Sequence, residues 1–220
     1  MIATWPCPGP RGPVPELALI CDRGRPRRLL IVPALFDEGN RLRRFTAQTM
    51  RELDALGIDC FLPDLPGSNE SPEPLIDQTV TGWHTALTAA ARHFAATRVL
   101  AIRSGALVAP DLPGWHYAPV TGSAVLRQML RARILTAREA GREESQAELM
   151  ETGARLGLEL NGYPLGPAMI AGLQAAQPGS DRAVISQADI GGSGLWLRAE
   201  PDEAPDQSRA LAGLIAGAEW

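Results

Sequence analysis

The sequence predicts an α/β fold in which a mostly parallel sheet is covered by helices on both faces. Three observations support this fold class. Short apolar segments alternate with amphipathic helical segments, the connections between them are brief, and 45% of the 220 residues are hydrophobic. Continuous apolar strands separated by helices are typical of a sheet that is buried on both sides. A chain of this length suits one domain covering residues 1–220.

The expected elements follow from this alternation. Residues 1–16 are rich in proline and glycine and are expected to be an irregular lead-in, whereas 16–22 alternates as an antiparallel edge strand does. Strands of the main sheet are predicted at 29–35, 58–63, 98–102, 115–120, 182–187 and 194–200. Helices are predicted at 41–56, 80–96, 104–110 and 206–217. Residues 123–165 are largely helical where the sheet needs only one crossover, so we expect a small helical lid there, over the carboxyl edge.

Composition limits the possible partners and location. The formal net charge of −4 argues against nucleic acid as a partner. The amino terminus has no apolar signal segment and no stretch is long enough to span a membrane, so a cytoplasmic location is expected. Cys7, Cys21 and Cys60 are scattered, which indicates reduced thiols and no zinc site. The sequence indicates no cofactor and no metal.

Five motifs occur in a fixed order along most of the chain. They are VPALFDEGNRLRR (32–44), DLPGSNES (64–71), VLAIRSGALVA (99–109), APVTGSAVLRQMLRARIL (118–135) and LELNGYPLGPAM (158–169). Together they resemble the exosortase A system-associated hydrolase 2 family, over roughly residues 29–200. The resemblance implies an α/β-hydrolase fold and an association with bacterial exopolysaccharide export and protein sorting. It implies the fold more directly than any activity.

The segment VLAIRSGALVA raises the question of activity. It is a strand that runs into a sharp turn, the sequence pattern of the nucleophile elbow of α/β-hydrolases. If the strand ends at Ile102, Arg103 occupies the nucleophile position, and members of the resembled family also tend to carry arginine there. Ser104 then follows the elbow. We favour Ser104 as a residue of the first helical turn that accepts a backbone N–H, with a shifted nucleophile as the alternative.

The other members of a catalytic triad are also missing from their expected places. The chain has three histidines, His84, His93 and His116, and none follows residue 200, where the base of a hydrolase is expected. His116 alone is placed to approach the pocket, but a half-buried imidazole bonded to backbone is the better interpretation. Asp189 stands where a triad acid belongs and also suits a glycine-rich turn. Ser104, Asp189 and His116 are therefore only weak catalytic candidates.

Arg103 at an elbow needs a partner, because a buried charge is costly to desolvate. We favour an internal ion pair with a carboxylate such as Asp37, Glu38 or Asp189. The alternative is that Arg103 faces a cavity and binds an anionic group, for example a phosphate of a saccharide precursor. Arg103, Asp37 and Glu38 are thus the candidate ligand-binding residues.

Four further residues have expected local roles. Asn40 is a possible cap for the helix that follows it. Arg43 and Arg44 are expected to be exposed helix residues, with a binding role left open by their place in a family motif. Asn69 replaces a glycine in DLPGSNES and is expected to adopt a positive φ.

Two classes of function remain. The favoured one is a pseudoenzyme, a non-catalytic accessory or binding protein of an exopolysaccharide or exosortase system. The other is an active hydrolase of an ester, thioester or lipid-linked saccharide with a non-standard catalytic arrangement. The partner would be a small anionic or saccharide-related ligand or another protein, and the sequence does not indicate the oligomeric state.

Overall fold

The computed structural model describes residues 1–198 and 202–220, and it is built on a seven-stranded sheet in the order β1-β2-β4-β3-β5-β6-β9. The strands are β1 (Ile2–Cys7), β2 (Val14–Cys21), β3 (Arg28–Val32), β4 (Asp59–Pro63), β5 (Arg98–Ile102), β6 (Gly114–Tyr117) and β9 (Ala183–Ile185). β2 runs antiparallel to both β1 and β4, and the remaining pairs are parallel. The mostly parallel sheet predicted from the sequence is confirmed.

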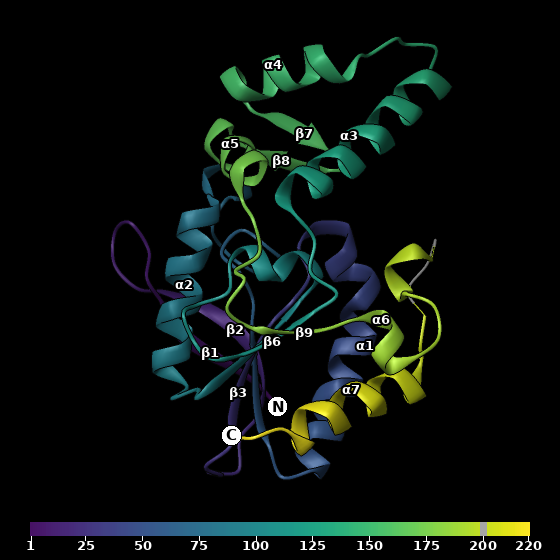
Figure 1. Ribbon diagram of the computed structural model, residues 1–220. Coiled ribbons are helices and arrows are strands. Elements are labelled where there is room, and N and C mark those ends of the chain that lie inside the picture. Colours follow the sequence, from purple (N-terminus) through teal and green to yellow (C-terminus); the bar gives the residue numbers. More distant parts are fainter. Residues whose placement is uncertain (199–201) are drawn as a thin grey trace.

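Helices cover both faces of this sheet. α1 (Phe36–Ala55) and α7 (Pro205–Gly217) lie against one face, and α2 (Val80–His93) lies against the other (Figure 1). Three short 3-10 helices, η1 (Leu75–Asp77), η2 (Arg103–Leu107) and η3 (Leu195–Leu197), and the single turn α6 (Gln187–Ile190) complete the connections.

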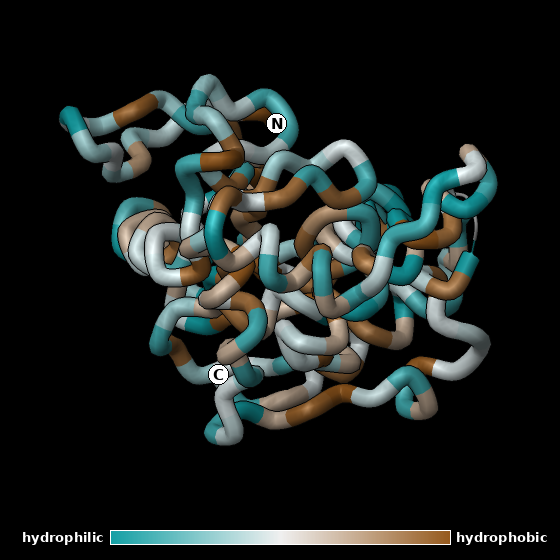
Figure 2. Tube along the Cα trace, turned by 90° about the horizontal axis from the view of Figure 1, so that it is seen from above, coloured by the Kyte–Doolittle hydropathy of each residue, from teal (hydrophilic) through white to brown (hydrophobic). Residues whose placement is uncertain are grey.

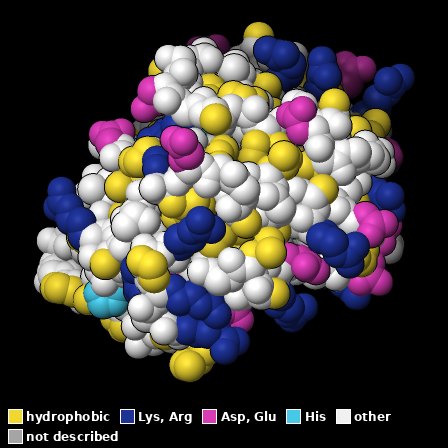
Figure 3. Space-filling model, turned by 60° about the horizontal axis from the view of Figure 1, so that its bottom comes forward, with side chains coloured by type: hydrophobic (Ala, Val, Ile, Leu, Met, Phe, Trp, Pro, Cys, Tyr) yellow, Lys and Arg dark blue, Asp and Glu magenta, His cyan; other side chains and the backbone are white. Residues whose placement is uncertain are grey.

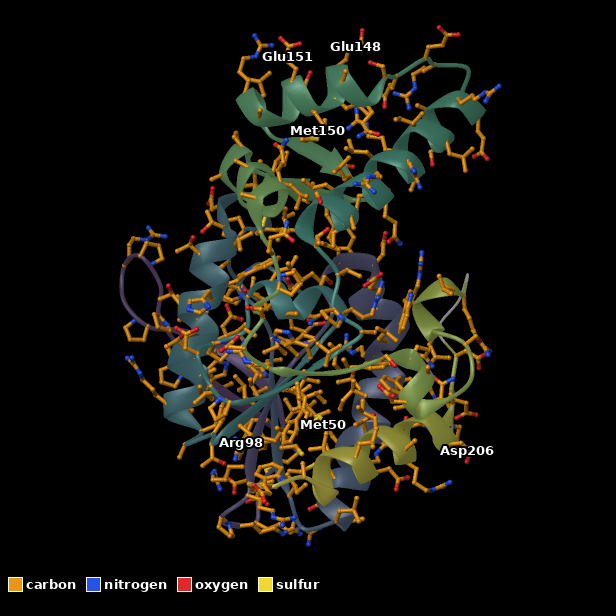
Figure 4. All side chains as sticks on the ribbon, viewed as in Figure 1. Met50, Arg98, Glu148, Met150, Glu151 and Asp206 are labelled. Carbon is orange, nitrogen blue, oxygen red and sulfur yellow. The ribbon has the colours of Figure 1, made fainter. Side chains whose placement is uncertain are left out.

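A cap layer lies above the carboxyl ends of the strands. It consists of α3 (Gly122–Glu139), α4 (Gln146–Leu156), the hairpin β7 (Leu158–Leu160) and β8 (Tyr163–Leu165), and α5 (Pro167–Ala175) (Figure 1). The helices α3 and α4 were expected here. The hairpin, which lies between α4 and α5 in the chain, was not expected. Figure 4 shows Glu148 and Glu151 on the outer side of α4, while Met150 lies on the inner side and packs against the core.

Alternation along the central strands builds two apolar clusters. Leu30 and Val32 of β3 point toward α2, whereas Leu29 and Ile31 point toward α1. β5 repeats this division, so that each face of the sheet carries its own core. Seen from above in Figure 2, the hydrophobic segments concentrate in the middle of the molecule and the hydrophilic ones lie mainly in outer loops.

Two strand predictions need correction. The strand at 16–22 is antiparallel, as expected, but it is not the edge, because β1 pairs outside it. The proline-rich start of the chain forms a strand since Trp5 and Cys7 alternate inward into the core, and an edge strand tolerates Pro6. At the other end, the predicted strand 194–200 is the 3-10 helix η3 where the structure describes it, and residues 199–200 lie outside the described part. Trp196 turns toward the elbow instead of joining the sheet.

The basic turn between β2 and β3 is neutralised within the protein. Arg25 and Arg28 donate to the fully buried carboxylate of Asp59, and Arg28 also forms a two-bond pair with Asp22. The Arg28 hydrogen bonds lower the pKa of Asp22 to about 2. Figure 3, which brings the bottom of the molecule forward, shows arginines gathered on this side with acidic side chains among them. This charge cluster therefore stabilises the turn internally.

Across residues 1–198 and 202–220, no helix combines the length and apolar character that crossing a membrane requires.

Candidate functional site

The backbone after β5 has the geometry of a nucleophile elbow. β5 ends at Ile102, and Arg103, the first residue of η2, has a φ of +52°. A bulky residue in this left-handed region is strained, and such strain is typical of a turn that presents a side chain above a sheet. The structure thus places Arg103 where a hydrolase has its nucleophile. The prediction of a helix at 104–110 is wrong, because the 3-10 helix η2 forms there and ends at Leu107.

Gly105 lets the elbow approach the segment after β3. A Cβ built on Gly105 would lie 2.4 Å from the carbonyl oxygen of Pro33 and 2.8 Å from that of Val32. These are backbone atoms, which cannot move aside as a flexible side chain does. The glycine of the motif therefore fixes the distance between the elbow and the β3–α1 turn.

Arg103 forms a closed set of contacts with its surroundings. Its Nε donates to Glu38 Oε2 at 3.2 Å, and its Nη2 donates to Glu38 Oε1 at 2.9 Å. Its Nη1 donates to the Ala118 carbonyl at 2.8 Å, and its guanidinium carbon lies 3.9 Å from the ring centroid of Trp196. The side chains of Arg103 and Glu38 are only 11% and 8% exposed. The guanidinium is thus occupied within the protein.

Glu38 reaches Arg103 because α1 begins earlier than the sequence suggested. The helix starts at Phe36, so Asp37 and Glu38 lie in its first turn, where carboxylates are favoured by the helix dipole. The residue preceding the helix is Leu35, and the interpretation of Asn40 as its cap is therefore wrong. Of the candidate partners of Arg103, the structure brings only Glu38 to it.

Ser104 is fully buried and has a structural contact of its own. Its Oγ accepts the backbone N–H of Leu35 at 2.8 Å. In α/β-hydrolases the oxyanion hole uses two backbone N–H groups. One belongs to the residue after the nucleophile and the other to the loop between the third strand and the helix that follows it, which corresponds here to the β3–α1 turn. The Leu35 N–H stands in that loop and is already bonded. Ser104 accepts a backbone N–H, as favoured, but from a segment 69 positions away and not from its own helix.

Little space remains above the elbow. A cavity of about 20 Å³ lies beside Ser104, walled by the start of α1 and by Val125, Gln128 and Met129 of α3. This volume holds about one water molecule. The start of α1 and helix α3 therefore pack closely around Ser104.

Asp37 and Asn40 hold the hairpin of the cap layer in place. Asn161 donates to Asp37 Oδ2 at 2.7 Å, and Asn40 donates to the Tyr163 hydroxyl at 2.9 Å. Phe36 adds an edge-on contact with Tyr163, with ring centroids 5.4 Å apart. Asp37, a candidate ligand residue, is thus engaged by the hairpin and not by Arg103.

The remaining triad candidates do not assemble. Asp189 is exposed and accepts both the backbone N–H and the hydroxyl of Ser186, which caps α6 and lowers the pKa of Asp189. His116 is fully buried, and its Nε2 lies 3.2 Å from Nη1 of Arg182. Within residues 1–198 and 202–220, no histidine forms a hydrogen bond with Arg103 or Ser104.

His116 and Arg182 form a buried pair that disfavours protonation. Arg182 also donates to the carbonyls of Leu112 and Pro110, so its charge is fixed beside the imidazole. Burial, and then the nearby Arg182, lower the pKa of His116. Since Arg182 can only donate, His116 Nε2 accepts and the ring is neutral. His116 is therefore a core residue, although its partner is a side chain and not the backbone.

This pair predicts a loss of stability in acid. Below the ordinary histidine pKa of about 6.5, the unfolded chain takes up a proton that folded His116 resists, so folding weakens as the pH falls. The contribution is at most about 1.4 kcal/mol per pH unit. We expect His116→Gln, which keeps an acceptor for Arg182, to lose less unfolding free energy between pH 7.5 and 5.5 than the wild type. Urea unfolding at the two pH values measures this, and equal losses in both proteins would contradict it.

A larger cavity lies on the other side of the β3–α1 turn. Its volume is about 570 Å³, and Pro33, Ala34, Leu35 and Phe36 separate it from the elbow. The loop DLPGSNES forms one wall, and Asn69 there has a φ of +51°, which confirms the expected positive angle. The cavity was not predicted from the sequence. Residues 36–40, the start of α1, were not expected to be helical, and its walls come from segments far apart in the chain.

A mostly parallel sheet with an antiparallel β2, helices on both faces and a strained elbow after β5 define an α/β fold of the α/β-hydrolase type. Neither a scan against protein-family models nor a search of curated proteins gives a match.

Solved structures include similar proteins. One is a protein from Agrobacterium vitis described as a candidate hydrolase, with 16% identity, a TM-score of 0.49, and coverage of 84% of this chain and 89% of that chain. An esterase from Thermogutta terrifontis has 15% identity, a TM-score of 0.49 and coverage of 84% and 79%. A serine hydrolase without a lid from Xanthomonas campestris has 16% identity, a TM-score of 0.43 and coverage of 86% and 72%. At these identities the likeness concerns the fold alone.

Proposed function

We propose that this chain is a non-catalytic α/β-hydrolase-fold protein that acts by binding. The observation that carries the proposal is the Arg103–Glu38 pair at the elbow. A guanidinium stays protonated and does not attack a carbonyl. Glu38 accepts two hydrogen bonds from this guanidinium. The elbow residue, which is the nucleophile in an enzyme, therefore serves here as a structural contact.

Two further features support the absence of hydrolysis. An ester, thioester or lipid-linked saccharide hydrolase needs a nucleophile within reach of a base. Ser104 is instead bonded to Leu35, and His116 is turned to Arg182. The occupied Leu35 N–H also removes one donor that would stabilise an oxyanion.

The resemblance of the five ordered motifs adds a biological setting to the proposal. We propose an accessory role in a bacterial exopolysaccharide or exosortase system, in the cytoplasm, with the whole chain acting as one domain. The partner would be a small ligand or another protein of that system. The net charge of −4 on this chain supports a partner other than nucleic acid.

Activity assays on the purified protein test the proposal. We expect no turnover of p-nitrophenyl acetate or butyrate above the buffer rate, and no labelling by a fluorophosphonate. Ser104→Ala should leave both results unchanged but lower the unfolding free energy by about 1–3 kcal/mol, since the buried Leu35 N–H loses its acceptor. Covalent labelling that disappears in Ser104→Ala would identify Ser104 as a nucleophile and overturn the proposal.

A further inference from the structure

The cavity of about 570 Å³ has the size of a small-molecule site, since such pockets commonly span about 300–1,000 Å³. It lies between the first half of α1 and the ends of β2 and β4, outside the closed elbow. Tyr163 and Trp83 border it on the side of the cap layer and α2.

One wall of this cavity is apolar and remains open to solvent. Leu17 and Leu19 of β2 and Leu62 of β4 line it, and Ile2 of β1 stands at its rim with 70% exposure. Leu19 and Leu62 are cross-strand partners, so their side chains lie next to each other. Apolar surface that stays hydrated in a concave site favours an apolar occupant.

Arg43 supplies a charge at the same cavity. It lines the cavity from α1, and it forms no hydrogen bond or ion pair with the residues that the structure describes. Its neighbours differ: Arg44 pairs with Glu203, and Arg41 donates to the Trp196 carbonyl. Arg43 is therefore a cation beside an apolar wall, with its donors available to a ligand.

Two acidic residues stand near Arg43 and bear on the charge of a ligand. Asp64 accepts the Asn69 amide at 2.6 Å, and burial raises the pKa of its carboxyl. Glu70 is exposed at the rim. Because one free cation stands beside two carboxyl groups, a head group with a single negative charge fits better than a doubly charged phosphate.

We propose that this cavity binds a single-chain amphiphile whose aliphatic chain lies along Leu17, Leu19 and Leu62 and whose carboxylate contacts Arg43. This inference rests on the binding role proposed above and gives it a site and a ligand class. The site is separate from the elbow, because neither Arg103 nor Ser104 lines the cavity.

Calorimetric titration with decanoate, below the concentration at which it forms micelles, tests the proposal. We expect saturable binding to the wild type, weakened about tenfold or more in Arg43→Ala, because a charge-assisted contact is lost. Arg44→Ala is the matched control, since it removes the same charge from the next position of α1 outside the cavity. Its affinity should stay within about twofold of the wild type.

Two filling variants test the apolar wall. Ala47→Phe on α1 and Leu62→Trp on β4 each place extra volume in the cavity, and both should reduce decanoate binding strongly. Thermal unfolding identifies whichever variant stays folded, and that variant carries the test. Binding that persists in a folded filled variant would overturn the proposal.

Related amphiphiles test the head group. We expect decanol, decylammonium and decyl phosphate to bind more weakly than decanoate. Tighter binding of decylammonium would reassign the site to a cation at Asp64 and Glu70, and tighter binding of decyl phosphate would overturn the choice of carboxylate. If decanoate does not bind while esters are still not hydrolysed, this inference fails and the non-catalytic proposal stands. Fluorophosphonate labelling together with decanoate binding would instead overturn the non-catalytic proposal and leave this inference standing.

Discussion

Replacing Arg103 with alanine is expected to lower the free energy of unfolding by about 3–5 kcal/mol. The variant leaves Glu38 buried at the start of α1 without its two guanidinium donors, and an uncompensated buried carboxylate is costly. It also removes the stacking on Trp196 and the hydrogen bond to the Ala118 carbonyl. Chemical unfolding at pH 7 measures the change.

A double-mutant cycle separates the ion pair from the rest of this loss. We expect Arg103→Ala together with Glu38→Ala to cost clearly less than the sum of the two single variants. Arg209→Ala is the control, because its pair with Asp206 is exposed and worth about 0–1 kcal/mol. A loss for Arg103→Ala no larger than that for Arg209→Ala would mean that the elbow pair does not stabilise the fold.

Gly105→Ala is expected to destabilise the protein by about 3 kcal/mol. The added methyl group would meet the Pro33 carbonyl oxygen at 2.4 Å, so either η2 or the turn before α1 must move. Such a movement would also stretch the bond between Ser104 and Leu35. Thermal and urea unfolding report the loss, and circular dichroism shows whether the helices remain.

Gly213→Ala provides the control for this glycine substitution. Gly213 lies in α7, and a Cβ there would meet no atom within 4 Å. Alanine has the higher helix propensity, so this variant should be more stable by up to about 1 kcal/mol. Similar effects of the two substitutions would show that close approach at Gly105 is not limiting.

The central strands could be predicted because their signal is local. Residues 29–32 of β3 and 99–102 of β5 are continuously apolar, and residues 60–62 of β4 form a shorter apolar run. Burial on both faces requires that pattern. The start of α1 could not be predicted in the same way. Helices commonly begin at a side-chain cap, but Leu35 has no capping side chain, and its N–H is bonded to Ser104. The signal for this helix start lies far away in the sequence.

The candidate site was predicted in part for the same reason. The spacing after β5 was enough to place Arg103 at the elbow, and Glu38 was among its three proposed partners. The choice between them depends on how α1 is set against β5, which no local pattern encodes. Trp196 was assigned to a strand, so its stacking on Arg103 could not be anticipated. The cavity could not be predicted because its walls come from β2, β4, α1 and the loops after β3 and β4, whose approach in space no local pattern encodes.

The bond between Ser104 and Leu35 has a consequence for anyone who would install hydrolysis in this scaffold. Arg103→Ser alone would supply a hydroxyl at the elbow. It would also leave the buried Glu38 without its guanidinium partner, and the Leu35 N–H would still be bonded to Ser104. The designer would also have to replace Ser104, introduce a base after residue 200, and open the 20 Å³ space under α3. Each of these changes is of no benefit to catalysis without the others. Under the non-catalytic function proposed above, hydrolysis would therefore require several substitutions made together.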